Sequence, residues 1–157
     1  MESTLIFQAR IAAPFGVLGI HCLQETLSNI VFLPPETPLL NPETPYTQEV
    51  CNQLHAYFRQ ADFPFKLALN LQGTLHQRKV WKSMQAIERG KTRQYGEIAR
   101  EIDSSARAVG QACGANPVPI VIPCHRIVGK AGIGGFAHHS AGYELDIKRW
   151  LLAHECQ

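Results

Sequence analysis

Reactive side chains gather in one short segment of the second half of the chain, where Cys124, His125 and Arg126 are adjacent. The apolar run before them, residues 116–123, contains three prolines, which restrict the backbone and fix the place of the cysteine. A cysteine attacks as a thiolate, and a neighbouring base can take its proton. Because adjacent side chains seldom point the same way, we expect His125 to reach Cys124 through a water molecule. The segment therefore predicts a nucleophilic cysteine with a histidine base.

A histidine base also needs a third group that fixes its tautomer. The downstream carboxylates that could do this are Glu144, Asp146 and Glu155. The cysteines and histidines show no zinc-ligand spacing, and the chain has no phosphate-binding loop and no dinucleotide fingerprint. We therefore expect chemistry without a metal or a cofactor. The remaining cysteines fit packing or tail positions: Cys22, Cys51, Cys113 and Cys156.

Short helices must position this segment. Apolar spacing predicts helices over residues 79–87, 95–102 and 104–115, the last one beginning with Ser104 as its cap. Two helices joined by a tight turn are typical of a helix-turn-helix. The side chains of residues 104–115 are nearly all small apart from Arg107, so this helix could approach a narrow minor groove. The alternative is close packing of two helices inside a core.

The first half of the chain is predicted to form a small sheet and one helix. Two runs of strand-forming residues predict a hairpin, a third run adds a strand, and a helix starts near Thr47. We place the domain boundary between residues 71 and 72, which makes an α+β protein with an N-terminal α/β lobe over 1–71 and a second domain over 72–157. The expected segments are strands over 4–10, 16–23 and 27–33, a proline-rich loop over 34–45, and a further strand over 67–71.

Composition and charge exclude several classes of protein. The chain has 157 residues, of which 45% are hydrophobic and 18% charged, as in globular proteins that bury a core. No apolar run approaches the ~18 residues of a membrane span, and residues 1–4 lack the basic region of a signal peptide. We therefore expect a cytoplasmic protein whose five cysteines are free thiols.

Charge divides unevenly along the chain. Residues 1–76 carry three Lys or Arg and six Asp or Glu, whereas residues 77–157 carry twelve and seven. A basic second half favours contact with a polyanion through that half alone.

The second half resembles the O6-alkylguanine-DNA alkyltransferases, also called methylated-DNA–protein-cysteine methyltransferases. The resemblance implies a ribonuclease-H-like N-terminal lobe, a small antiparallel sheet with a helix, followed by a winged-helix or helix-turn-helix lobe that carries the reactive cysteine. Residues 1–70 match the family in outline only. The motifs that carry the resemblance, in the family's order, are 80–81, 90–92, 95–99, 107–110, 116–117, 122–128 and 148–155.

The resemblance implies direct-reversal DNA repair. The chain would bind double-stranded DNA that contains O6-alkylguanine, turn the base out of the stack and transfer its alkyl group irreversibly to Cys124, once per molecule. O4-alkylthymine is a second implied substrate, and the chain is expected to act as a monomer that does not bind membranes. His125 would be the base, and Glu155 would orient it. Tyr95 would donate a proton or a hydrogen bond to the leaving guanine, and Asn116 would brace the turn that carries the cysteine.

The same resemblance implies two further groups of residues. The DNA-binding residues would be Ser104, Ala106, Arg107, Gly110 and Arg126, with Arg107 filling the gap that the base leaves in the stack. The alkyl pocket would be lined by Tyr95, Cys113, Ile127, Phe136 and Ala137.

This sequence also departs from the family pattern. Phe136 stands where a tyrosine is common, and the stretch from Phe136 to Glu155 is longer and contains His138 and His139. Three alternatives remain: a non-reactive alkyltransferase-like protein that binds DNA lesions, a Cys-His hydrolase on another scaffold, and a winged-helix regulator. The first of these lacks the nucleophile in its family, whereas Cys124 is present here.

Overall fold

The computed structural model describes residues 5–136 and 142–156. The chain divides into two compact units, Met1–Leu71 and Gln72–Gln157, and each is described by itself. Helices and strands occur in both units, which confirms the expected α+β class. The ribonuclease-H-like and winged-helix assignments remain predictions. Within the described residues, no helix combines the length and the apolar character needed to cross a bilayer.

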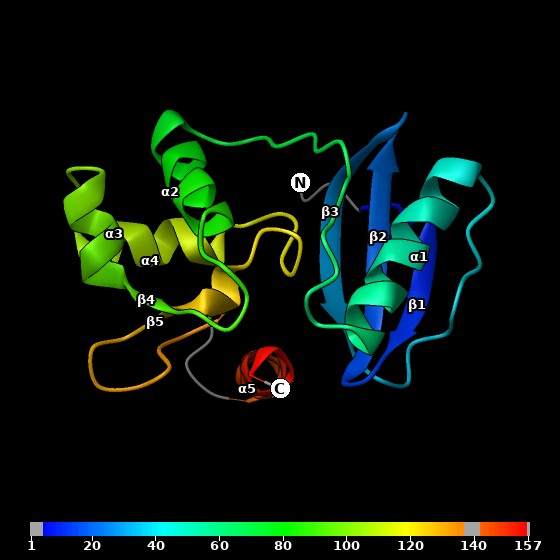
Figure 1. Ribbon diagram of the computed structural model, residues 1–157. Helices are drawn as coiled ribbons and strands as arrows, with labels where there is room; N and C mark the ends of the chain where they lie inside the picture. Colours follow the sequence, from blue (N-terminus) through cyan, green and yellow to red (C-terminus); the bar gives the residue numbers. More distant parts are fainter. Residues whose placement is uncertain (1–4, 137–141, 157) are drawn as a thin grey trace. The chain divides into compact units, whose positions relative to one another are not determined.

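The first unit is built on an antiparallel sheet of three strands in the order β1-β2-β3 (Figure 1). The strands are β1 (Ala9–Ala13), β2 (Gly16–Leu23) and β3 (Thr26–Leu33). Two-residue turns join them, because Ala13 pairs with Gly16 and Leu23 pairs with Thr26. The buried side of the sheet is aliphatic and includes Leu18, Ile20, Leu27 and Ile30.

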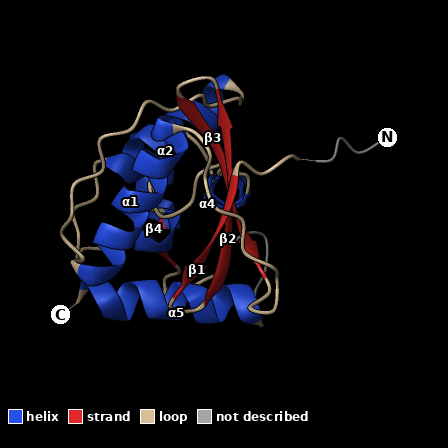
Figure 2. Cartoon of the chain, turned by 90° about the vertical axis from the view of Figure 1, so that its right-hand side faces the viewer, coloured by secondary structure: helices blue, strands red, loops and turns tan. Residues whose placement is uncertain are grey.

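Helix α1 (Pro45–Arg59) covers one face of this sheet, as Figure 2 shows. Thr44 caps it by accepting a hydrogen bond from the backbone N–H of Thr47 at 3.2 Å, and Pro45 takes the first helical turn, where no donor is needed. Its buried side chains recur at helical spacing and pack toward the sheet: Val50, Cys51, Leu54 and Tyr57.

Three expectations about this unit need correction. The first strand is Ala9–Ala13 and not residues 4–10, because the chain turns at residues 14–15. The helix begins at Pro45 and not at Thr47, since Thr44 supplies the cap. Residues 67–71 form no strand. Only an isolated bridge between Leu27 and Leu69 joins this segment to β3, with backbone hydrogen bonds of 2.8 and 2.9 Å.

The second unit is mainly helical. Helix α2 (Leu75–Gln85) starts four residues earlier than expected, because Thr74 and Gln77 form a capping box. The other elements are β4 (Arg93–Gln94), α3 (Tyr95–Glu101), α4 (Ala106–Gly114), the single 3-10 turn η1 (Cys124–Arg126), β5 (Ile127–Val128) and α5 (Tyr143–Glu155).

Helix α4 packs against both α2 and α3. The indole Nε1 of Trp81 on α2 donates to the carbonyl of Ala112 on α4 at 2.8 Å, in a buried position. Ser105, not Ser104, caps α4, because its hydroxyl accepts from the N–H of Ala108 at 3.1 Å. Parallel pairing of β4 with β5 joins Arg93 to Ile127. This pairing brings the first residue of α3 to the segment that carries Cys124.

Candidate functional site

The segment before Cys124 is a turn closed by one side chain. Asn116 accepts from the N–H of Val118 at 3.0 Å and donates from Nδ2 to the carbonyl of Ile122 at 2.8 Å. Ile120 between them has φ +76°, a conformation that β-branched residues rarely adopt. The two hydrogen bonds of Asn116 close the turn around this strained residue, and its role as a brace for Cys124 stays a prediction.

Cys124 is the first residue of η1 and is only 5% exposed. Burial raises the pKa of its thiol to about 11, although Asn116, Lys148 and the backbone N–H groups of Cys124 and His125 pull it down. In this resting geometry the group is a thiol at neutral pH. It needs a base to become a nucleophile.

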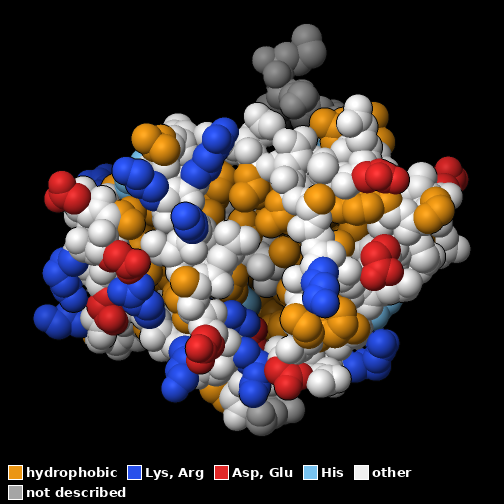
Figure 3. All heavy atoms as spheres, turned by 45° about the horizontal axis from the view of Figure 1, so that its top comes forward, with side chains coloured by type: hydrophobic (Ala, Val, Ile, Leu, Met, Phe, Trp, Pro, Cys, Tyr) orange, Lys and Arg blue, Asp and Glu red, His pale blue; other side chains and the backbone are white. Residues whose placement is uncertain are grey.

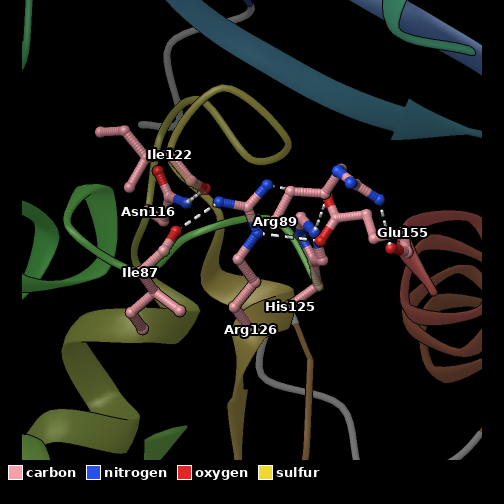
Figure 4. Close-up of polar contacts among 7 residues, drawn as sticks. All are labelled: Ile87, Arg89, Asn116, Ile122, His125, Arg126 and Glu155. Carbon is pink, nitrogen blue, oxygen red and sulfur yellow. Dashed lines mark hydrogen bonds and ion pairs between the residues drawn. The ribbon is translucent and has the colours of Figure 1, made fainter. Parts of the chain in front are cut away.

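His125 can be that base. Its ring is fully buried, and its Nε2 lies 2.8 Å from Oε2 of Glu155, the last residue of α5 (Figure 4). A carboxylate only accepts, so Nε2 carries the hydrogen and Nδ1 carries the lone pair. Burial lowers the pKa of His125, against the pull of Glu155, and keeps the ring neutral. Nδ1 is buried and has no hydrogen-bond partner in the described part of the chain, so its lone pair is available to accept a proton.

Of the three carboxylates that the sequence left open, Glu155 reaches His125. The other two lie in the first turn of α5, at residues 144 and 146, whereas Glu155 ends that helix. Arg89 donates to the backbone carbonyl of Glu155 at 3.0 Å and ties the end of the helix to the loop after α2.

The side chain of Arg126 turns inward. Its Nε and Nη2 donate to the two carboxylate oxygens of Glu155 at 2.9 and 3.0 Å, and its Nη1 donates to the carbonyl of Ile87. The side chain is 14% exposed. The family resemblance implied that Arg126 contacts DNA, but all three guanidinium nitrogens donate to acceptors within the protein.

Tyr95 opens α3 and lies between two glycines. A Cβ on Gly110 of α4 would lie 3.9 Å from one edge of the ring, and a Cβ on Gly134 only 2.8 Å from the other edge. Gly134 also has φ +73°, so only glycine fits this close approach without strain. The phenol donates to the carbonyl of Gly135 at 3.3 Å, and burial raises its pKa to about 12. Tyr95 is therefore a protonated donor at neutral pH.

Lys148 is a site residue that sequence reasoning missed. Its side chain is fully buried, and Nζ donates to the carbonyls of Ile127 at 2.7 Å and Gly135 at 2.9 Å. Burial lowers its pKa to about 8. The available signal was periodicity, because Lys148 and Glu155 stand in α5 at the helical spacing of the buried residues Leu145 and Leu151.

Three of the expected pocket residues are buried: Cys113, Ile127 and Phe136. The Cys113 thiol lies 3.8 Å from the sulfur of Met84, and burial raises its pKa to about 12. Tyr95, a fourth expected pocket residue, is described above. The fifth, Ala137, lies outside the described residues, as do His138 and His139.

The expected DNA-binding residues in and before α4 differ in their surroundings. Ala106 and Arg107 are exposed, whereas Gly110 faces the Tyr95 ring. Ser104 lies in the turn before the helix, where its hydroxyl is 2.8 Å from Nε2 of His76. In the face shown in Figure 3, Lys and Arg side chains, with some Asp and Glu among them, gather on the left-hand side, over the second unit.

Comparisons with known proteins agree with this geometry. The domain described as 6-O-methylguanine DNA methyltransferase, DNA binding domain, matches residues 75–157. A methylated-DNA–protein-cysteine methyltransferase of Mycolicibacterium paratuberculosis is 38% identical over 151 residues, which cover 91% of this chain and 88% of that protein. This chain belongs to the methylated-DNA–protein-cysteine methyltransferase family. The resemblance read from residues 80–155 is thereby confirmed.

Solved structures of the methyltransferase family extend the match to both units. The crystal structure of the Mycobacterium tuberculosis O6-methylguanine methyltransferase has a TM-score of 0.79 and 36% identity, and the match covers 94% of this chain and 90% of that one. The M. tuberculosis protein OGT in complex with DNA matches with a TM-score of 0.75 and 37% identity, over 94% and 91%. The constitutive methyltransferase of Bacillus subtilis is 41% identical over 113 residues, 70% of this chain and 66% of the relative.

Proposed function

We propose that this chain repairs alkylated DNA by moving the alkyl group from O6 of guanine to the sulfur of Cys124. The observation that carries the proposal is the buried Cys124 beside His125, whose Nε2 is fixed on Glu155 and whose buried Nδ1 has no hydrogen-bond partner among the described residues. Membership of the methylated-DNA–protein-cysteine methyltransferase family supports the substrate and the reaction class.

The reaction is a displacement at carbon. His125 takes the thiol proton at Nδ1 through a bridging water, and the thiolate of Cys124 attacks the alkyl carbon. The carbon–oxygen bond breaks as the sulfur–carbon bond forms, and the guanine leaves with the electron pair of that bond. The thiol proton ends on the guanine, so the products are an S-alkylcysteine and an unmodified base. A thioether is too stable to release its alkyl group, so each molecule reacts once.

Tyr95 serves the leaving group. Its phenol remains protonated at neutral pH. Tyr95 lies beside the segment that carries Cys124, because β4, which directly precedes Tyr95, pairs with β5, which directly follows that segment. We assign it a hydrogen bond to N3 of the guanine, which neutralises the charge that builds on the base. Asn116 serves the nucleophile, because its two hydrogen bonds hold the turn before Cys124 in a fixed shape.

Helix α3, the turn and α4 are assigned to DNA as a helix-turn-helix that enters the minor groove. The small exposed residues at the start of α4 allow close approach, and Arg107 is a long exposed side chain that would fill the space of the extruded base. Affinity should fall as salt rises, because Lys and Arg side chains displace counterions from phosphates. We extend the same chemistry to O4-alkylthymine, which offers an equivalent alkyl carbon, and we expect a monomer to suffice.

Mass spectrometry after incubation with a duplex that contains O6-methylguanine tests the proposal. We expect one adduct of about 14 Da, the mass of a methylene gained in a displacement, on the peptide that contains Cys124. The reaction should stop at one equivalent. Cys124→Ala should bind the duplex without forming an adduct, whereas Cys156→Ser, which changes an exposed thiol, should react like the parent protein.

The alternatives predict other results. A lesion-binding protein without transfer would leave the mass unchanged, and a Cys-His hydrolase would release product in a burst followed by steady turnover. An adduct on a cysteine other than Cys124 would contradict the proposed role of the His125–Glu155 pair.

A further inference from the structure

The carboxylate of Glu155 accepts hydrogen bonds from two side chains, His125 and Arg126. Its Oε2 is 2.8 Å from Nε2 of His125 and 3.0 Å from Nη2 of Arg126, and its Oε1 accepts from Nε of Arg126 at 2.9 Å. Figure 4 shows the His125 and Arg126 side chains, both from η1, converging on this carboxylate at the end of α5. The carboxylate is 1% exposed, so water contributes little to its charge balance.

The protonation of this group decides what His125 can do. An ionised carboxylate can only accept, which forces the hydrogen of the neutral ring onto Nε2 and leaves Nδ1 with its lone pair. If Glu155 took up a proton and donated it, Nε2 would have to accept and the ring hydrogen would move to Nδ1. If His125 took up the proton instead, Nδ1 would again carry hydrogen. In both protonated forms the ring has lost its capacity to act as a base at Nδ1.

We propose that Arg126 is a positioning residue that keeps Glu155 ionised and so holds His125 in the tautomer with a free Nδ1. This inference rests on the proposed function, in which Nδ1 receives the thiol proton. Two parallel N–H donors from one guanidinium match the two oxygens of a carboxylate and neutralise its charge. The buried pair of Arg126 and Glu155 then has no net charge, and the His125 ring beside it is neutral.

The other charges around His125 do not replace Arg126. Lys148 acts on the ring at a distance, while its Nζ donates to the carbonyls of Ile127 and Gly135. The bond that Arg89 donates goes to the main-chain carbonyl of Glu155. The pKa of His125 is lowered by burial, Arg126 and Lys148 and is raised by Glu155, so removal of Arg126 shifts the balance toward proton uptake.

The test is the pH profile of alkyl transfer at saturating duplex, where DNA affinity no longer affects the rate. The rate of the parent should change little between about pH 7 and pH 8, because burial lowers the pKa of His125 below its ordinary value. In Arg126→Gln we expect the apparent pKa of the His125–Glu155 pair to rise by roughly 1–3 units. The rate of Arg126→Gln should then fall from pH 8 to pH 6 by several-fold more than the rate of the parent.

Nitrogen NMR of the His125 ring gives a readout that is independent of activity. At neutral pH the parent should show hydrogen on Nε2 alone, and Arg126→Gln should show hydrogen on Nδ1. Arg126→Lys keeps the charge and loses the paired donors, so we expect the parental tautomer and a flat profile with a somewhat lower rate. Arg149→Gln is the matched control for loss of one positive charge, because its ion pair with Asp146 on α5 is exposed.

Failure to fold would not leave the question open. Arg126→Gln combined with Glu155→Gln removes both members of the buried ion pair together, and we expect a folded protein with mixed tautomers and slow, pH-independent transfer. An equal loss of rate at every pH in Arg126→Gln, with an unchanged ring, would make Arg126 a structural brace only. A loss of DNA affinity with a normal saturated rate would return it to the DNA-binding role. If the parent itself forms no adduct on Cys124, the proposed function fails instead.

Discussion

Replacement of Lys148 by methionine should change how stability depends on pH. The ammonium group is fully buried, and its pKa falls from 10.5 to about 8. Between these values the unfolded chain holds the proton that the folded chain has released, so the free energy of unfolding rises with pH. A shift of this size corresponds to about 3 kcal/mol that is lost below the folded pKa and regained above the unfolded one.

Methionine has no proton to release, so the variant lacks this rise. From pH 7 to pH 10 the parent should gain about 2.5 kcal/mol relative to Lys148→Met. The neutral amine still has two N–H groups for the carbonyls of Ile127 and Gly135, whereas methionine leaves both without this donor. Tyrosines and cysteines titrate in the same range, and their contributions cancel in the difference between parent and variant, except at Cys113 and Cys124, whose pKa values Lys148 lowers.

Urea unfolding of the parent and Lys148→Met at several pH values measures this difference. Lys130→Met changes an exposed lysine and should give a difference that does not vary with pH. If the difference for Lys148→Met were also constant, the ammonium would be as well solvated in the folded chain as in the unfolded one. The burial that defines its place in the site would then be wrong.

Three further substitutions test the geometry of the site. Asn116→Ala removes both hydrogen bonds that close the turn, so urea unfolding should show a loss of about 1–3 kcal/mol with slower transfer, and an unchanged rate would show that the turn keeps its shape without them. Gly134→Ala places a methyl group 2.8 Å from the Tyr95 ring and should lower the rate at saturating duplex, whereas a parental rate would mean that the ring moves without consequence. Phe136→Ala should slow transfer of a benzyl group more than of a methyl group in single-turnover assays, while Phe136→Tyr changes methyl transfer by at most about tenfold. Equal benzyl rates for Phe136→Ala and the parent would place residue 136 outside the alkyl pocket.

Much of the site was predictable because its residues are close in sequence or belong to recognisable motifs. Cys124 and His125 are adjacent, and proline spacing marked the turn that holds them. The pairing of His125 with Glu155 crosses 30 residues, and the chemistry of the residues alone left three carboxylates open. Only the resemblance to the methyltransferase family selected Glu155, and the structure places it against the ring.

Other features could not be read from local patterns. The family resemblance implied that Arg126 contacts DNA, yet its side chain turns inward, where it binds the buried carboxylate of Glu155. Lys148 interrupts an apolar face, and its partners are main-chain carbonyls that leave no trace in the sequence. The start of α2 was a missed local signal, since Thr74 and Gln77 show the spacing of a capping box.

The positive φ of Ile120 has a consequence for how the second unit opens. A strained residue persists only while its surroundings hold it, and here the two hydrogen bonds of Asn116 enclose it on both sides. Loss of either bond releases the strain and favours loss of the other. The N–H groups of Ile122 and Cys124, which bond to main-chain carbonyls of the same turn, are therefore expected to exchange with deuterium in one cooperative event. Cys124 is thus expected to belong to a small unfolding unit, whose opening frequency can be measured separately from that of the surrounding helices.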